Sequence, residues 1–268
     1  MANSELSNIS QSAINQMRSA YSQKDSYRFI VTGNASPFNI TLPETINLTP
    51  GIDHEITLIR FESYNSLFNI TAANNQFRYN NGRDWKIITL APGAYEITSI
   101  NREVQRQMKL VNDFAFATGK DTFHFKLFPN QSTLRSVIEL SNNYKVDFSI
   151  PNSFKDILGY DAKVYNAPYN QSENIIKIQT FNSILLETDL CSDSFLNGQS
   201  SQVIGEFSPN QVPPGFKILI EPLNPIFIKV PINKKSFNFF KVWITDDQLN
   251  TVNFNGEFVS MTLWLRSV

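Results

Sequence analysis

The sequence contains very little cysteine, histidine and glycine. It has one Cys, two His and ten Gly among its 268 residues. The single cysteine, Cys191, excludes an intrachain disulfide framework and a cysteine-based zinc site. Because glycine is scarce, asparagine and proline must supply most of the turns, since Asn tolerates a positive φ and Pro fixes φ at a value that suits a turn.

Long apolar runs and blocks of one charge are also lacking. No stretch approaches the roughly 18 apolar residues of a membrane span, and the first 30 residues contain no continuous apolar core, so we expect neither a membrane span nor secretion. The chain has 23 Lys and Arg against 24 Asp and Glu, a net charge of −1. Without a basic block, direct binding of nucleic acid is not expected.

The residues that are abundant favour strands. The chain has 30 Asn, 26 Ser, 16 Thr and 22 Phe, 40 Ile and Val together, and only 12 Ala. Side chains that are β-branched or aromatic fit a pleated, half-buried surface better than a helix. Apolar residues make up 41% of the chain, which is enough for a sizeable core. The composition therefore predicts a folded, mainly β protein.

Strand-like runs follow one another from Tyr27 onward. Alternation is clear in Met261–Leu265, where the odd positions form one apolar face and Trp264 lies on the other, and in Phe123–Leu127, where His124 and Lys126 lie opposite the apolar face. The predicted strands are Tyr27–Thr32, Asn39–Leu42, Glu55–Phe61, Gln76–Tyr79, Trp85–Leu90, Thr122–Phe128, Leu134–Leu140, Tyr144–Ile150, Asn174–Thr180, Ile184–Asp189, Gln202–Phe207, Phe216–Glu221, Ile226–Val230, Phe237–Thr245 and Glu257–Leu265.

Two short helices interrupt the strands. In the first, Thr98 or Ser99 is the expected N-cap, and the apolar face consists of Ile100, Val104, Met108 and Val111. The second runs from Asn152 through Leu158 and ends at a left-handed Gly159. Asn81-Gly82 predicts a hairpin turn. We expect five glycines in structural turns: Gly82, Gly93, Gly159, Gly215 and Gly256.

About fifteen short strands and two helices predict an all-β fold, a jelly-roll β-sandwich. Because this number of strands exceeds the eight of one jelly roll, either one roll carries a large insertion or two compact rolls stand in tandem. The tandem arrangement, with a junction near Pro151, gives an N-terminal arm of residues 1–25, a first lobe of residues 26–150 and a second lobe of residues 151–268.

The N-terminal segment differs from the rest of the chain. Its few apolar residues recur at helical spacing among Ser, Gln and Asn. One interpretation is a frayed terminus, and the other is an assembly arm that orders against a neighbouring subunit. The residues that would carry this arm are Leu6, Ile9, Met17 and Tyr21.

Residues suited to catalysis form no recognisable pattern. We expect His54 and His124 to be ordinary surface or interface residues, because no nucleophile motif accompanies them. Cys191 has no cationic neighbour in sequence and is expected to be a small buried hydrophobe.

The acidic residues give equally little sign of a site. Glu206, Glu221 and Glu257 lie on or beside predicted strands, but none has the alternate-residue spacing of a carboxylate pair. Asp246-Asp247 lie before Asn250 in a spacing that fits a solvated turn better than a calcium loop. The sequence therefore predicts no catalytic residue, metal or cofactor, and a protein that assembles or binds rather than an enzyme.

A series of weak motifs resembles one family when the motifs are taken in order. They are Glu55–Ile59, Tyr64–Ile70, Pro92–Ile97, Lys145–Phe148, Asn152–Tyr160, Val212–Ile218, Asn224–Ile228, Ile244–Gln248 and Phe254–Glu257. This order, over about residues 37–266, resembles the jelly-roll capsid proteins of Polinton/Maverick elements and adintoviruses. The chain has Asn250 where relatives usually have Gly, and Asn255 where they have Arg. These are turn positions, so the two departures bear on turn geometry more than on the fold.

The resemblance implies a structural virion protein of a double-stranded DNA virus or virus-like element, made in the host cytoplasm or nucleus. The short chain is similar to the minor, penton-type protein, a pentamer at the five-fold vertices. Major capsid proteins of that group carry two jelly rolls, form trimers and are usually longer, and the high strand count keeps this alternative open. Its partners would be further copies of itself and other capsid proteins. A glycan-binding or receptor-binding β-sandwich is the other alternative, and it would need exposed aromatics clustered on one concave face.

Overall fold

The computed structural model describes residues 25–117, 119–141, 143–179, 181–209 and 212–268. The chain divides into two compact units. The first consists of the residues up to Asn65 together with Phe181–Val268, and the second is the continuous segment Ser66–Thr180. The fold is mainly β, as predicted, with two helices in the described residues, both in the second unit.

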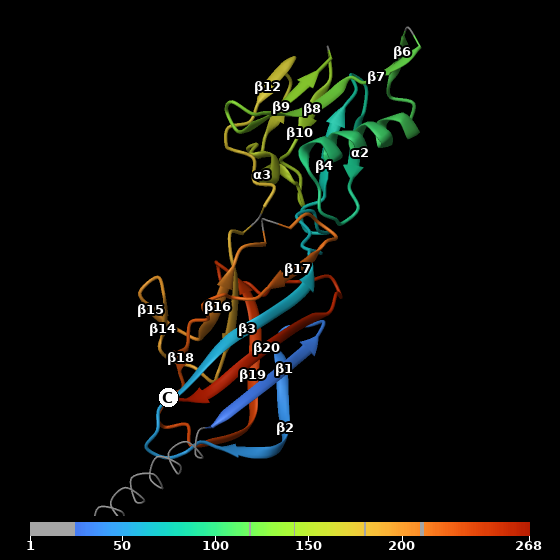
Figure 1. Ribbon diagram of the computed structural model, residues 1–268. Coiled ribbons are helices and arrows are strands. Elements are labelled where there is room, and N and C mark those ends of the chain that lie inside the picture. Colours follow the sequence, from blue (N-terminus) through green and yellow to red (C-terminus); the bar gives the residue numbers. More distant parts are fainter. Residues whose placement is uncertain (1–24, 118, 142, 180, 210–211) are drawn as a thin grey trace, which may run out of the picture. The chain divides into compact units, whose positions relative to one another are not determined.

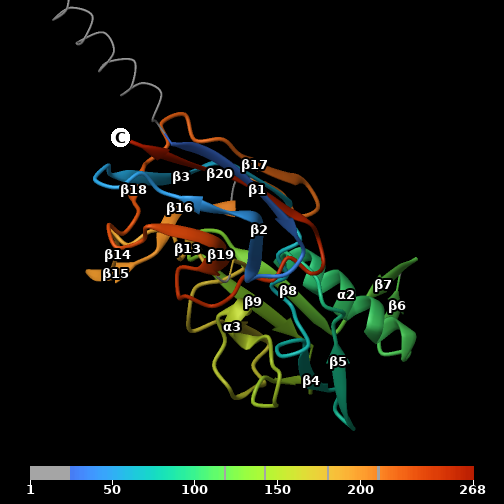
Figure 2. The same ribbon diagram turned by 90° about the horizontal axis from the view of Figure 1, so that it is seen from below.

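The first unit is a two-layer sandwich (Figures 1 and 2). Eight strands form two antiparallel sheets with the orders β1-β20-β3-β17 and β16-β13-β19-β2, and β18 also pairs with β3. The strands are β1 (Ser26–Gly33), β2 (Phe38–Asn47), β3 (His54–Tyr64), β13 (Ile184–Thr188), β16 (Val203–Phe207), β17 (Lys217–Ile220), β18 (Ile228–Lys229), β19 (Ser236–Asp246) and β20 (Val259–Ser267).

The strand order identifies this sandwich as one jelly roll. When the eight strands are numbered along the chain without the short β18, one sheet has the order 1-8-3-6 and the other the order 5-4-7-2. The first and last strands therefore lie side by side, and the second lies beside the seventh, as in a jelly roll. The insertion leaves after β3 and the chain returns at β13. Of the two predicted arrangements, one roll with a large insertion is therefore the one that forms.

The predicted lobes 26–150 and 151–268 are consequently wrong. β3 pairs with β20 through contacts such as Phe61 opposite Met261, which joins segments about 200 residues apart. The proline and turn signals near Pro151 mark a loop inside the second unit. Such local signals cannot show that β3 pairs with a strand about 200 residues away. The predicted arm, residues 1–25, lies outside the described residues except for Asp25.

Alternating side chains build the core between the two sheets. Along β20, Met261, Leu263 and Leu265 are fully buried, as their spacing predicts. Rings from opposite sheets meet in the core: Phe61 of β3 lies 4.5 Å from Phe207 of β16, measured between ring centroids. Burying such large apolar side chains contributes roughly 1.5–3 kcal/mol each, so the core rather than the surface holds the roll together.

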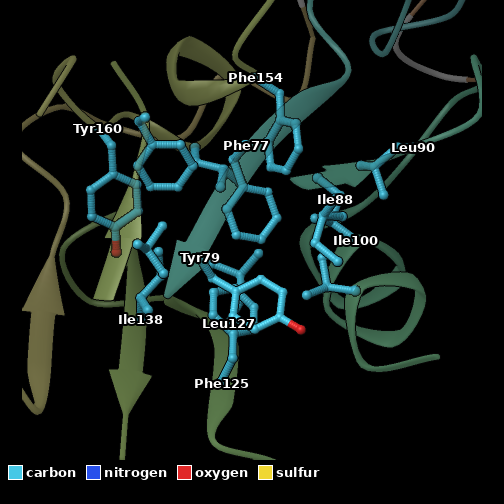
Figure 3. Close-up of a cluster of buried hydrophobic side chains, with 14 of the residues drawn as sticks. Phe77, Tyr79, Ile88, Leu90, Ile100, Phe125, Leu127, Ile138, Phe154 and Tyr160 are labelled. Carbon is cyan, nitrogen blue, oxygen red and sulfur yellow. The ribbon is translucent and has the colours of Figure 1, made fainter. Parts of the chain in front are cut away.

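The second unit has a core of its own (Figure 3). Two sheets with the orders β11-β10-β4-β5 and β12-β9-β8 enclose it, and α2 (Ile97–Leu110) packs against β8. The remaining elements are β4 (Gln76–Asn80), β5 (Trp85–Thr89), β6 (Ala115–Ala117), β7 (Lys120–Thr122), β8 (Phe125–Asn130), β9 (Arg135–Leu140), β10 (Lys145–Asp147), α3 (Lys155–Leu158), β11 (Val164–Tyr165) and β12 (Tyr169–Gln171).

Helix α2 begins earlier than predicted. Its N-cap is Glu96, not Thr98 or Ser99, and Ile97 is buried with Ile100 and further apolar residues of the same face. Burial of Ile97 extends the apolar stripe toward the N-terminus, and this tertiary contact outweighs the capping preference of Thr and Ser. At the other end Val111 is half exposed, so the predicted apolar face stops at Met108.

The predicted strand Asn174–Thr180 does not form in the described residues. Its described residues are irregular and do not join a sheet. Asn174 N–H donates to Gly159 O, Ile176 N–H to Leu134 O and Lys177 N–H to Ile157 O. The segment thus bonds to α3, to the C-cap of α3 and to the turn before β9 instead of following one neighbouring strand. An apolar β-branched run cannot reveal this.

Candidate assembly surfaces

One edge of the jelly roll presents an unusual amount of apolar surface. β17 and β1 are the edge strands of their sheet. Edge strands offer unpaired backbone groups to other chains, and proteins usually blunt them with proline or unpaired charge. β17, with the sequence Lys-Ile-Leu-Ile, has no proline, and its one charge, Lys217, is ion-paired with Glu62 of β3.

We call the exposed apolar side chains along this edge the edge surface. Its members are Phe216, Leu219, Leu223 and Ile226, whose side chains are 65, 48, 97 and 74% exposed. Leu219 belongs to β17, while Leu223 and Ile226 belong to the loop that joins β17 to β18 (Figure 1). Single exposed apolar residues are common, but four within eleven residues make this edge a candidate interaction surface.

The outer face of β20 holds this loop in place. As predicted, Trp264 lies on the face opposite the core, and its Nε1–H donates to Ser26 Oγ over 3.1 Å. Phe227 packs edge-on against Trp264 at 5.5 Å, and the Arg266 guanidinium lies 3.5 Å from the Phe227 ring centroid. Trp264 therefore packs within its own chain, where it anchors the loop.

No protein-family model matches the chain, and no curated protein matches its sequence. Among solved structures, the chain is similar to a crystal structure of selenomethionine-labelled mavirus penton protein, at 10% sequence identity and a TM-score of 0.49. The alignment covers 92% of this chain and 100% of that one. The assignment of the jelly roll rests on the strand order described above.

The predicted arm residues Leu6, Ile9, Met17 and Tyr21 lie outside the described residues. The first described residue is Asp25. Its backbone carbonyl accepts a hydrogen bond from the Ser267 N–H, at the end of β20, over 2.9 Å. The described part of the chain therefore begins beside the end of the last strand of the roll.

Four of the five predicted turn glycines have left-handed backbones. The φ angles are 89° at Gly82, 79° at Gly159, 81° at Gly215 and 85° at Gly256. Gly82 forms the predicted hairpin between β4 and β5, and Gly159 is the C-cap of α3. Gly93 differs: it forms an isolated antiparallel bridge with Ile70.

The two histidines occupy different settings, and neither is plainly a surface residue. His54 is buried, and its Nε2–H donates to Asp25 Oδ2 over 2.7 Å. Burial raises the pKa of the Asp25 carboxyl, but hydrogen bonds from His54 and the Thr49 amide outweigh burial, so the pKa lies below its usual value. His124 is half buried and stacks on Tyr144 at 4.7 Å. His54 thus contradicts the prediction of a surface residue and acts as a structural tie.

Cys191 is a small buried hydrophobe, as predicted. It is 1% exposed, and burial raises the pKa of its thiol to about 12. Its Sγ–H donates to the carbonyl of Gln202 over 3.1 Å. A protonated, buried thiol is a poor nucleophile.

The three candidate glutamates lie apart in the fold. Glu206 is on β16 of one sheet, Glu221 follows β17 of the other, and Glu257 precedes β20; all three are exposed. Glu221 pairs with Arg60 over 3.4 Å. Asp246 forms a turn with Asn250, whose backbone N–H donates to Asp246 Oδ1 over 2.8 Å, as predicted. In the described part of the chain no three His, Cys, Asp or Glu side chains gather as a metal site would require.

A buried polar cluster in the second unit was missed from the sequence. Asp113 is 7% exposed and accepts hydrogen bonds from the hydroxyls of Tyr79 and Tyr144 and from Lys86 Nζ. Burial and the neighbouring carboxylate raise the pKa of both tyrosines. The cluster ties the loop after α2 to β4, to β5 and to the residue that precedes β10. Its members are spread over 66 positions of sequence without a common motif, so only the fold brings them together.

Exposed aromatic side chains are distributed over both units. Trp85 is on β5, Phe116 on β6, Phe195 on β14 (Ser194–Leu196) and Phe239 on β19. A glycan-binding face would gather such rings on one surface. No helix in the described residues has the length and apolar character needed to cross a bilayer.

Proposed function

We propose that this protein is a non-enzymatic structural subunit of a viral capsid, of the penton type, which assembles with copies of itself and with other capsid proteins in the virion. The observation that carries the proposal is the single jelly roll formed by β1–β3, β13, β16, β17, β19 and β20. Within the family that the ordered motifs resemble, one roll is the pattern of the penton protein and two rolls are the pattern of the major protein.

The surface of the roll suits assembly. Its core residues are fully buried and rigidly packed, so the subunit keeps its shape when it meets neighbours. The edge surface supplies apolar area that a neighbour can bury, and closed symmetry then fixes the number of copies.

The near-neutral charge of the chain fits the same role. A net charge of −1 leaves little repulsion between copies packed side by side. It also gives the subunit little attraction for a packaged genome, which would be neutralised by other proteins or ions.

The oligomer number tests this proposal. Mass photometry of the purified full chain, across salt and pH, is expected to show a species at five times 30.6 kDa, about 153 kDa. Negative-stain microscopy should show five-fold particles. Trimers would favour the major capsid protein instead, and a strict monomer even at high concentration would count against a capsid role altogether.

A further inference from the structure

Three apolar side chains are exposed where helix α2 ends and the β6–β7 hairpin begins. Leu110 is 71% exposed, Val111 50% and Phe116 72%. Leu110 is the last residue of α2, Val111 is its C-cap, and Phe116 is on β6. Figure 1 shows that the hairpin projects past the end of the helix. We call these three side chains the tip.

Contacts within the chain hold the parts of the tip together. Phe116 lies opposite Asp121 in the hairpin, and opposed residues of an antiparallel pair project from the same face. The Asp121 carboxylate accepts a hydrogen bond from Lys109 Nζ of α2 over 2.6 Å. Lys109 Nζ also lies 5.6 Å from the ring centroid of Phe114, the residue before β6. The face of the hairpin that carries Phe116 is therefore the face joined to α2, so the three apolar side chains gather at one end of the unit.

The exposed face of α2 that leads to the tip is basic. Arg102, Arg106 and Lys109 follow one another at helical spacing on the side opposite the buried residues. Glu103 is the single acidic residue in the sequence of α2, and it pairs with Arg106 over 2.7 Å. Lys120, on β7, is exposed and has no ion pair among the described residues. Cations therefore accompany the apolar tip.

The inserted unit as a whole has the opposite charge to the rest of the chain. Residues 66–180 contain 13 Lys and Arg against 10 Asp and Glu, a net charge of +3. The remaining residues contain 10 Lys and Arg against 14 Asp and Glu, a net charge of −4. The near-neutral total thus combines a basic unit with an acidic one. A surface of negative charge would attract the inserted unit and repel the rest of the chain.

We propose that the tip binds the surface of an anionic lipid bilayer. The apolar side chains of the tip enter the boundary between headgroups and acyl chains, and the neighbouring cations Lys109 and Lys120 stay at the level of the headgroups. This function goes beyond the proposed capsid role. It uses a different surface from the edge surface, so binding does not depend on how many copies of the chain assemble.

The chemistry of the tip favours a bilayer over other anionic partners. A nucleic acid would attract the same cations, but its phosphate backbone offers no apolar surface on which to bury Leu110 and Val111. A specific protein partner usually buries about 800 Å² on each side, whereas three side chains on a helix end and a projecting hairpin present a small surface. A bilayer interface can take up a small apolar group of this kind, and its anionic headgroups match the cations beside it.

Flotation of the purified full chain with lipid vesicles tests the proposal. The wild type should float with vesicles of phosphatidylcholine and phosphatidylserine in equal parts, and its partition coefficient should be at least tenfold lower with phosphatidylcholine alone. Leu110→Glu and Phe116→Glu each place a negative charge in the tip and should lower the partition coefficient at least tenfold. Because both side chains are largely exposed, circular dichroism should show that both variants remain folded.

Matched controls separate the tip from general effects of charge. Phe195→Glu makes the same change at a side chain that is 74% exposed on β14 of the first unit, and it should float like the wild type. Lys120→Glu reverses a charge beside the tip and should lower the partition coefficient at least fivefold. Lys177→Glu makes the same change on an exposed residue beside α3, away from the tip, and should retain at least half of the binding.

Several results would overturn the proposal. Equal flotation with both kinds of vesicle would exclude a preference for anionic lipid. Flotation that neither Leu110→Glu nor Phe116→Glu weakens would exclude the tip. Absence of flotation, together with binding of a random-sequence DNA duplex, would show that the basic unit serves a nucleic acid instead. Mass photometry of the same samples reports the oligomer number separately, so a strict monomer that floats as expected would overturn the capsid role and leave the lipid site standing.

Discussion

At the residue scale, Gly159 occupies the most constrained position among the glycines. Its φ of 79° is left-handed, and a Cβ there would lie 2.8 Å from the Ile175 carbonyl oxygen. Because that neighbour is backbone, it cannot move aside as a side chain would. The predicted left-handed cap is thus confirmed, with a steric requirement that the sequence did not reveal.

Gly159→Ala should therefore destabilise the second unit by at least about 2 kcal/mol, from left-handed strain of roughly 1–2 kcal/mol plus the clash. Urea unfolding with amide hydrogen exchange in α2 and β9 measures the loss. Gly119→Ala is the control in the same unit: its φ is 76°, but a Cβ would meet nothing within 4 Å. It should cost about 1 kcal/mol. Equal losses of stability in the two variants would show that the Asn174–Ile175 backbone moves aside for the new Cβ.

The Asp25–His54 pair makes the stability of the roll depend on pH. Because the folded-state pKa of Asp25 lies below its usual value, its ionised form stabilises the fold at pH above about 4. This contribution is lost as the pH falls through the folded-state value. Asp25→Asn should lower the free energy of unfolding by about 1–2 kcal/mol near neutral pH.

The difference between wild type and Asp25→Asn should shrink below pH 4, measured by urea unfolding at several pH values. Asp53→Asn is the control variant, because Asp53 is next to His54 in sequence but its side chain is exposed. A difference that stays constant down to pH 2 would mean that the Asp25 charge does not contribute.

At the element scale, helix α2 is well packed but poorly capped. Glu96 occupies the N-cap with extended backbone angles, φ −90° and ψ 162°, and its side chain makes no capping hydrogen bond. The side chain of serine is short enough for its hydroxyl oxygen to accept a hydrogen bond from a free backbone N–H of the first turn. The helix therefore has room for stabilisation without any change to its buried face.

Glu96→Ser should stabilise the second unit by about 0.5–1 kcal/mol, with slower amide exchange in the first turn of α2. Glu96→Ala is the control, because it removes the glutamate without adding a capping group. It should not raise the free energy of unfolding. Faster exchange in the serine variant would contradict a capping effect.

Most elements could be predicted from the sequence, and their partners could not. Alternation fixed the buried face of β20 because Met261, Leu263 and Leu265 repeat every second residue. Asn197-Gly198, with φ of 51° and 78°, forms the hairpin turn between β14 and β15 (Gln199–Ser201), and its sequence is a local hairpin signal. The pairing of β3 with β20 has no local signal, because periodicity reports which face is buried and not which strand covers it.

The candidate site shows the same division. The single Cys191 and the turn at Asp246 behaved as predicted from their neighbours in sequence. The edge surface did not stand out, because Leu219 and Ile226 look like any apolar strand residues until the sheet edge is known. The tie between Asp25 and His54 likewise depends on two chain segments meeting in the fold.

At the scale of the whole molecule, we expect the predicted arm to contribute to assembly rather than to folding. The roll holds Asp25 at the end of β20, and the described core lies entirely after that residue. Deleting residues 1–24 should leave the thermal unfolding midpoint within about 2 °C and weaken assembly, as judged by mass photometry. An unchanged oligomer mass after the deletion would show that the segment has no role in assembly.

The position of the insertion has a consequence for biosynthesis. The segment Ser66–Thr180 is continuous and encloses its own core, whereas the roll needs strands from both sides of that segment. A ribosome therefore completes the inserted unit while β1, β2 and β3 still await β13 and the strands that follow it. Domains fold as units during synthesis, so we expect the inserted unit to mature first, and the edge that we propose for assembly to be completed only after β17 has emerged.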